Sequence, residues 1–254
     1  MLEIVKFESY EKSIPELLDK VRFKGLLKKN KKKIILKPNL TLNKKPPTTT
    51  NVKFVEETVK YIKNYSRERI IIAEGSGGST TKECFEELGY GKLAEKYDIG
   101  LVDLNGAETV KIKKPEFKKF KVIEYPKILL NSFLISLPVL KEHHEATVTL
   151  SLKNMLGVFP SKHYQSRGVS WKNKIHKWSI DYSIHDILAC KFPDFAICDA
   201  SIGQIGGEVS GEPKKFGLLL AGFPLEVDKK GAEILGYDWR KIRHLVFASE
   251  LVER

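Results

Sequence analysis

The sequence predicts an α/β protein with a mainly parallel sheet flanked by helices. Short runs rich in Ile and Leu, such as Lys33–Lys37 and Arg69–Ala73, are typical of buried strands. They alternate with stretches such as Val52–Tyr65, in which apolar residues recur at helical spacing. This alternation favours a parallel sheet, because each helix returns the chain to the edge where the next strand begins.

The other elements follow from the same patterns. Further strands are predicted at Leu2–Phe7, Gly100–Leu104, Phe133–Leu140, Phe195–Cys198 and Phe216–Ala221. Further helices are predicted at Ile14–Phe23, Lys92–Tyr97, Glu145–Leu156, Ser179–Cys190 and Glu226–Leu235, with another after a capping box at Thr80 and Glu83. We expect one α/β domain over residues 1–254, in which segments 105–130 and 158–180 are candidates for a small inserted subdomain.

The charge balance limits the choice of partners. The chain has 44 Lys and Arg against 32 Asp and Glu, a formal net charge of +12. Such a balance is typical of nucleic-acid-binding proteins. The alternative is the lysine-rich surface of a thermophilic protein, which the content of only two Met also fits. Both interpretations stay open, as does a small polyanionic ligand.

The three cysteines, Cys84, Cys190 and Cys198, form no metal-binding spacing. We therefore expect neither an iron–sulfur cluster nor a structural zinc site in this chain. The first residues lack the basic-then-apolar layout of a secretory signal, and no apolar run is long enough to cross a bilayer. These observations predict a cytoplasmic protein without a membrane partner. They leave the oligomeric state open.

Basic and imidazole side chains gather where a predicted strand and a predicted helix end. Lys141 and His143 follow the apolar run Phe133–Leu140, while Lys153 and Asn154 precede Gly157. In parallel sheets, ligands bind outside the carboxyl ends of the strands. Adjacent side chains of an extended segment point in opposite directions, so at most one of His143 and His144 faces such a site. The alternative is a solvated strand end with lysines on the helix surface.

Two glycine-rich loops are further candidates. Gly75, Gly77 and Gly78 precede a helix, where free N–H groups suit an anion; the alternative is an ordinary βα turn. Gly206 and Gly207 either shape a site or belong to a surface loop. Neither loop matches a nucleotide-binding motif.

Three carboxylates at strand or helix ends are candidate ligands of a divalent metal. They are Glu74, Asp199 and Asp228. For Asp228, the alternative is support of a helix N-terminus.

Aromatic and basic residues are interleaved between Tyr164 and Tyr182. They include Trp171, Lys172, Lys174, His176, Lys177 and Trp178. This pattern suits stacking on single-stranded nucleic acid. The alternative is a partly buried lid whose lysines reach outward to water.

Several of these segments resemble the uncharacterised family called domain of unknown function 362. The matching motifs are LKPNL at Leu36–Leu40, TTTN at Thr48–Asn51, AEGSGG at Ala73–Gly78, LPVLKEHHEATVTLSLKNMLG at Leu137–Gly157, FAICDA at Phe195–Ala200, GGEVSGEP at Gly206–Pro213 and AGFPLEVD at Ala221–Asp228. The resemblance covers nearly the whole chain and implies an α/β fold and a site, but no reaction. Phe223 stands where the family often has Asp, and the ferredoxin-like cysteine segment of some relatives is missing. Both departures weaken any redox role.

The function expected from these observations is an enzyme or a binding protein for an anionic small molecule, with metal assistance as an option. The catalytic candidates are His143, Lys141 and Lys153. The ligand-binding candidates are Lys37, Asn39, Gly75, Gly77, Gly78, Asn154, His163, His176, Gly206 and Gly207. Lys37, Lys141 and Lys153 are expected to bind acidic groups, and His143 to act as the acid/base. The alternative function is RNA binding or modification.

Overall fold

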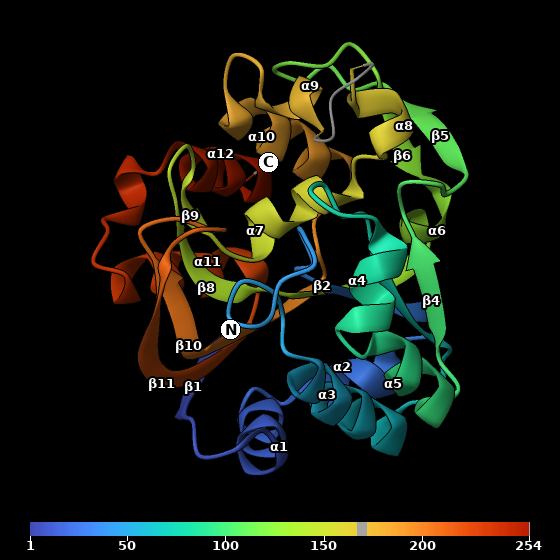
Figure 1. The fold of residues 1–254 in the computed structure, drawn as a ribbon, viewed down its shortest axis with the longest axis vertical. Coiled ribbons are helices and arrows are strands. Elements are labelled where there is room, and N and C mark those ends of the chain that lie inside the picture. Colours follow the sequence, from blue (N-terminus) through green and yellow to red (C-terminus); the bar gives the residue numbers. More distant parts are fainter. Residues whose placement is uncertain (167–171, 254) are drawn as a thin grey trace.

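The computed structural model describes residues 1–166 and 172–253. In this part of the chain a nine-stranded sheet runs through the molecule, with helices on both of its faces (Figure 1). The strand order is β1 (Leu2–Lys6), β11 (Glu212–Gly222), β10 (Phe195–Ile205), β7 (Ser132–Leu137), β2 (Lys33–Pro38), β3 (Ile70–Glu74) and β4 (Gly100–Asp103), with β8 (Val139–His143) beside β10 and β9 (Thr147–Thr149) beside β8.

The helices of the described residues connect and cover these strands. They are α1 (Tyr10–Lys20), α2 (Phe23–Lys29), α3 (Val52–Tyr65), α4 (Thr81–Glu87), α5 (Tyr90–Tyr97), α6 (Lys127–Leu130), α7 (Ser151–Asn154), α8 (Ser161–Tyr164), α9 (Asn173–His176), α10 (Ile180–Cys190), α11 (Pro224–Ile234) and α12 (Arg243–Val252), with 3-10 turns η1 (Met155–Val158) and η2 (Trp239–Lys241).

The sheet is mostly parallel. Strands β10, β7, β2, β3 and β4 pair with their neighbours in parallel, whereas β11 runs antiparallel to both β1 and β10. The predicted α/β fold, a mainly parallel sheet flanked by helices, is confirmed. Strands β2, β3 and β7 therefore end at the same edge of the sheet, where their last residues are Pro38, Glu74 and Leu137.

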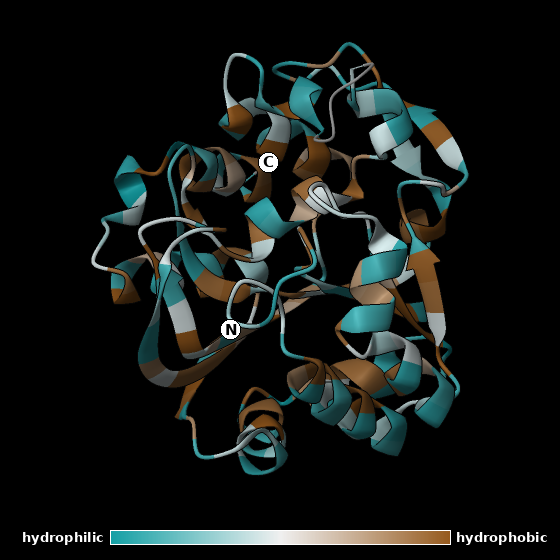
Figure 2. Cartoon of the chain, in the orientation of Figure 1, coloured by the Kyte–Doolittle hydropathy of each residue, from teal (hydrophilic) through white to brown (hydrophobic). Residues whose placement is uncertain are grey.

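Each face of the sheet has its own hydrophobic core, because successive residues of a strand point to opposite faces. Ile35 packs in one buried cluster with residues of α10, α11 and α12, whereas Ile34 and Leu36 pack in the other with residues of α1, α2 and α3. Figure 2 shows hydrophobic residues concentrated on the strands and on the helix faces toward them. Burial on both faces explains why these strands are continuous apolar runs.

The region predicted as one helix, Glu145–Leu156, is different in the structure. Strand β8 turns back into β9, and the hairpin is followed only by the short helix α7 and the turn η1. The sequence Thr147-Val148-Thr149-Leu150 alternates polar and apolar residues, and Val148 and Leu150 are buried, as a strand pattern requires. The apolar residues around this segment also fit a helical spacing, so the strand-like alternation was interpreted as part of a helix.

The second glycine loop is also shorter than predicted. Strand β10 continues beyond Cys198 as far as Ile205, and β11 begins at Glu212. Only residues 206–211 lie between these two strands. The antiparallel pairing of β10 with β11 extends through the polar and glycine-containing sequence, because ladder hydrogen bonds need no apolar side chains.

Described residues of the segments 105–130 and 158–180 belong to the hydrophobic core that contains Ile35. The first contains the two-stranded sheet of β5 (Thr109–Ile112) and β6 (Ile123–Pro126). Its Tyr125 and the second segment's Tyr164 and Ile175 belong to the same buried cluster as Ile35. Both segments thus share apolar contacts with the main sheet, and the single domain remains a prediction.

Asp228 of α11 fixes the start of α7. Its carboxylate accepts hydrogen bonds from the backbone N–H groups of Ser151 and Leu152, both at 2.8 Å, and from the Ser151 hydroxyl. Substitution of Asp228 by Ala leaves these buried donors without an acceptor, so we expect the free energy of unfolding to fall by about 2–3 kcal/mol. Urea denaturation measures this, with Glu86→Ala at an exposed position as the control. Equal stability of the two variants would contradict this capping role.

Candidate functional site

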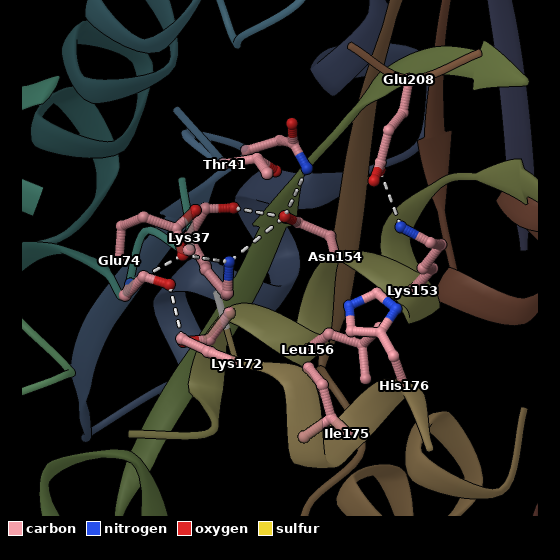
Figure 3. Close-up of a pocket in the computed structure, with 14 residues that line it drawn as sticks. Lys37, Thr41, Glu74, Lys153, Asn154, Leu156, Lys172, Ile175, His176 and Glu208 are labelled. Atoms are coloured by element: carbon pink, nitrogen blue, oxygen red, sulfur yellow. Dashed lines mark hydrogen bonds and ion pairs between the residues drawn. The ribbon is translucent and has the colours of Figure 1, made fainter. Parts of the chain in front are cut away.

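The ends of β2 and β3 meet α7 at a pocket of about 100 Å³ (Figure 3). Its lining is mostly polar and comes from segments far apart in the sequence. The lining residues are Lys37, Asn39, Thr41, Glu74, Gly75, Gly77, Lys153, Asn154, Leu156, Gly157, Lys172, Ile175, His176 and Glu208. The pocket lies at the carboxyl ends of parallel strands, the edge at which the sequence predicts a site.

Lys37 and Glu74 form a buried ion pair at the floor of the pocket. Their charged atoms lie 2.9 Å apart, and both side chains are almost completely inaccessible. Burial lowers the pKa of Lys37, and Glu74 opposes this shift. The Lys37 amine also donates to the Pro38 carbonyl and to Asn154 Oδ1, each at 3.2 Å, so its three N–H groups are all used inside the protein.

Gly157 covers this ion pair at close range. A Cβ atom at position 157 would collide with Glu74 Oε1 and Lys37 Nζ. The absence of a side chain is therefore what lets η1 pack directly over the charges.

Glu208 is the centre of a second cluster. Its carboxylate lies 2.8 Å from Lys153 Nζ, 2.9 Å from His143 Nε2 and 3.2 Å from the Thr149 hydroxyl. Burial alone raises the pKa of Glu208, but the positive charge of Lys153 and the partner His143 outweigh it and hold the pKa well below its ordinary value. Sequence reasoning missed this residue, although it is the one charged side chain between Gly206 and Gly211.

His143 faces Glu208 and does not line the pocket. Its Nδ1 accepts hydrogen bonds from the backbone N–H groups of Glu145 and Ala146, both at 3.0 Å, which places the ring proton on Nε2 toward Glu208. Burial lowers the pKa of His143. The neighbouring His144 is exposed, and His143 is the one of the two histidines that faces Glu208. The geometry makes His143 a support for Glu208 and not the acid/base of the pocket.

Lys141 is also engaged within the protein. Its amine donates to Asn39 Oδ1 at 2.9 Å, to the Thr48 carbonyl at 2.7 Å and to the Glu208 carbonyl at 3.5 Å. Burial lowers the pKa of Lys141 to about 8. Since its three N–H groups have acceptors and the side chain does not line the pocket, Lys141 holds the loops around Asn39 and Glu208 together.

Lys153 and Lys172 differ from these two lysines. In the described part of the chain, Lys153 has a single hydrogen-bond acceptor, Glu208, which leaves two N–H groups for a ligand. Lys172 donates to the carbonyls of Gly75 at 2.6 Å and Gly157 at 3.0 Å, and its third N–H group has no acceptor in the part of the chain that the structure describes. Burial lowers the pKa of Lys172 to about 7. Sequence reasoning assigned Lys172 only to the aromatic and basic segment.

Comparison with known proteins gives the family. The sequence model described as domain of unknown function (DUF362) matches residues 34–233, which is most of the chain and includes every residue that lines the pocket. The chain belongs to the DUF362 family. It is similar to the thylakoid-associated protein sll1697 of Synechocystis sp. (strain ATCC 27184 / PCC 6803 / Kazusa), with 24% identity over 231 residues, 87% of this chain and 69% of that protein. No helix in the described part of this DUF362 chain is long and apolar enough to span a membrane.

The glycine loop after β3 does not offer the anion-binding N–H groups that its sequence suggests. In this DUF362 protein, Gly77 and Gly78 donate to the Thr41 carbonyl, Gly75 to Glu74 Oε1 and Ser76 to the Thr81 hydroxyl. Each N–H group from residue 75 to residue 78 thus has an acceptor. The loop shapes the pocket wall, and its N–H groups from residue 75 to residue 78 are already engaged within the protein.

The three candidate metal ligands are not brought together. Glu74 pairs with Lys37, Asp228 caps α7, and Asp199 accepts from the Tyr10 hydroxyl at 2.7 Å and from Ser201. Among the described residues, no group of three or more His, Cys, Asp or Glu side chains is placed to hold a metal. A metal site shared by these carboxylates therefore has no support in the geometry of this DUF362 protein.

The remaining candidate residues differ in whether they line the pocket. His176 lines the pocket at its rim, where its Nδ1 lies 2.8 Å from Glu145 Oε2. His163, Gly206 and Gly207 do not line it, but the two glycines have positive φ and form the turn that carries Glu208 to Lys153. In the aromatic segment, Tyr164 is buried and Trp178 is 89% exposed. Trp171 lies outside the described residues.

The shifted pKa of Glu208 predicts how stability changes in acid. Because the folded-state pKa is depressed, the stabilising contribution is complete well above the ordinary pKa of about 4.3 and is lost as the pH falls below it. Because Glu208 also raises the pKa of His143, the comparison is made in variants that lack this histidine: we expect the free energy of unfolding to fall less steeply between pH 6 and pH 4 in His143→Gln/Glu208→Gln than in His143→Gln. Urea denaturation at both pH values measures this, and parallel pH dependences would refute it.

Proposed function

We propose that this protein binds a small anionic molecule in the pocket, with Lys153 and Lys172 as the groups that contact it, and that it acts on that molecule as an enzyme or a binding protein. The observation that carries the proposal is the distribution of hydrogen bonds among four buried lysines. Lys37 and Lys141 have used all their N–H groups, whereas Lys153 and Lys172 have N–H groups at the pocket without an acceptor among the described residues. The expected roles of Lys37 and Lys141 therefore change from ligand contact to support.

The formal charges of the side chains in or beside the pocket favour the binding of an anion. Four lysines, Lys37, Lys141, Lys153 and Lys172, lie in or beside the pocket, and the carboxylates of Glu74 and Glu208 oppose them. Buried charges are stable only when they are paired. A bound anion would supply the missing negative charge and would draw the lysines with lowered pKa toward their protonated form.

The size of the pocket limits what can enter it. At about 100 Å³ it is smaller than the sites that enclose drug-sized ligands, which begin at about 300 Å³. A carboxylate or phosphate group on a small molecule suits this space, while larger portions of a ligand would extend past His176 at the rim.

A thermal-shift screen tests the proposal. Phosphate, sulfate, pyruvate and citrate are compared with potassium chloride at equal ionic strength, and single-stranded RNA is included because the net charge is +12. A ligand that binds only the folded state raises the melting temperature. We expect at least one small anion to do so beyond the chloride control. Stabilisation by RNA alone, or by none of these anions, would overturn the proposal.

A further inference from the structure

The Lys172 amine is held in an unusual way for a lysine. Two of its N–H groups point at the carbonyl oxygens of Gly75 and Gly157, and the third position of the nitrogen has no partner among residues 1–166 and 172–253, while the side chain lines the pocket. Unlike Lys37 or Lys153, Lys172 makes no direct ion pair with a carboxylate among the described residues. An amine that needs only two acceptors is equally well satisfied in its neutral form, where the third position is a lone pair.

The charged groups around Lys172 oppose one another. Burial lowers its pKa most, Glu74 and Asp103 raise it, and Lys37 lowers it again, which leaves the pKa at about 7. At pH 7 about half of such amines are neutral, compared with roughly one in 2,500 for an ordinary lysine. Neutral lysine amines in desolvated pockets are nucleophiles toward carbonyl carbons.

We propose that Lys172 forms an imine with the carbonyl carbon of a small oxo acid bound in the pocket. This inference rests on the proposed anion site, in which the carboxylate of the oxo acid would bind. The ligand class is therefore a small molecule with both a carboxylate and a ketone or aldehyde group.

The step balances without an external oxidant or reductant. The neutral amine attacks the carbonyl carbon, forming a C–N bond while the C=O electron pair moves to oxygen. One proton passes from nitrogen to that oxygen, and a second proton, released when the ammonium group became the neutral amine, converts the hydroxyl to water as the nitrogen lone pair breaks the C–O bond. Overall, an ammonium group and a carbonyl give a protonated imine and water. The protonated imine keeps one N–H group, enough for one of the two carbonyl acceptors.

Trapping with borohydride tests the inference on the full-length protein. The protein is incubated with pyruvate at pH 7, reduced with sodium borohydride and digested for peptide mass spectrometry. The expected adduct adds the mass of pyruvic acid less one oxygen atom to Lys172. We expect at least about tenfold more adduct there than on an average exposed lysine, because of the larger neutral fraction.

Two buried lysines serve as internal controls. Lys37 and Lys141 are as buried as Lys172, but their N–H groups are all committed, so neither should carry the adduct. Lys172→Met should lose the dominant adduct, whereas Lys121→Met at an exposed position should keep it. If pyruvate raises the melting temperature but the adduct is spread over exposed lysines, the imine is refuted and the anion site stands. If pyruvate neither stabilises the protein nor labels Lys172, this ligand class is overturned, and the other anions of the screen decide the proposed function.

Discussion

Replacing Lys37 by Met should lower the free energy of unfolding by about 3–5 kcal/mol. The substitution removes the positive partner of Glu74, whose side chain is 3% exposed and cannot reach water without rearrangement. It also removes the hydrogen bonds that the Lys37 amine donates to Pro38 and Asn154 at the end of β2. Breaking a buried ion pair from one side costs more than the pair contributes, because an uncompensated charge remains. Urea denaturation measures the loss.

The double variant Lys37→Met/Glu74→Gln is the matched control. Removing both charges eliminates the unpaired carboxylate, so the double variant should regain part of the stability that the single variant loses. Lys12→Met breaks the exposed pair of Lys12 with Glu8 and should change stability little. A loss in Lys37→Met no larger than in Lys12→Met would show that the Lys37–Glu74 pair is not the buried support described above.

Lys153→Met and Glu208→Gln should change anion affinity in opposite directions. Lys153 provides charge-assisted hydrogen bonds to the ligand, so its loss should weaken binding by about tenfold or more. Glu208 occupies Lys153 through an internal carboxylate at 2.8 Å, and an anion must compete with it. A neutral glutamine competes less, so Glu208→Gln should bind the anion more tightly. Isothermal titration with the anion that stabilises the protein most measures both changes.

An exposed lysine outside the pocket gives the reference for these affinities. Lys121→Met removes one positive charge without touching the pocket lining. Its affinity should stay close to the wild-type value at moderate salt, because exposed charges are screened. If Lys121→Met and Lys153→Met weaken binding equally, general charge attraction explains the affinity, and the proposed contact between Lys153 and the anion is refuted.

The sheet and the location of the site could be predicted from sequence because both depend on local patterns. The runs Lys33–Lys37 and Arg69–Ala73 are apolar on both faces, which only a buried strand explains, and they became β2 and β3. Once the strands were placed, their polar ends had to share an edge. Lys37 and Glu74 meet there, and Lys153 with Asn154 closes the pocket from α7.

The individual roles could not be predicted, because they depend on contacts between distant segments. Whether a lysine is free depends on its acceptors, and those of Lys141 lie at Asn39, Thr48 and Glu208. Nothing local distinguishes it from Lys153. Asp228 illustrates the same limit, since its carboxylate supports a helix 76 and 77 residues earlier in the chain. Sequence spacing shows that such groups exist but not which of them meet.

The most direct test of the anion site is the position of an anion in a crystal. Soaking crystals of the protein in selenate and collecting data at the selenium absorption edge locates each bound anion by its anomalous signal. The anion site described here predicts a peak in the pocket, within hydrogen-bond distance of Lys153 Nζ or Lys172 Nζ. Peaks only at exposed lysines, with an accessible pocket left empty at saturating selenate, would contradict it.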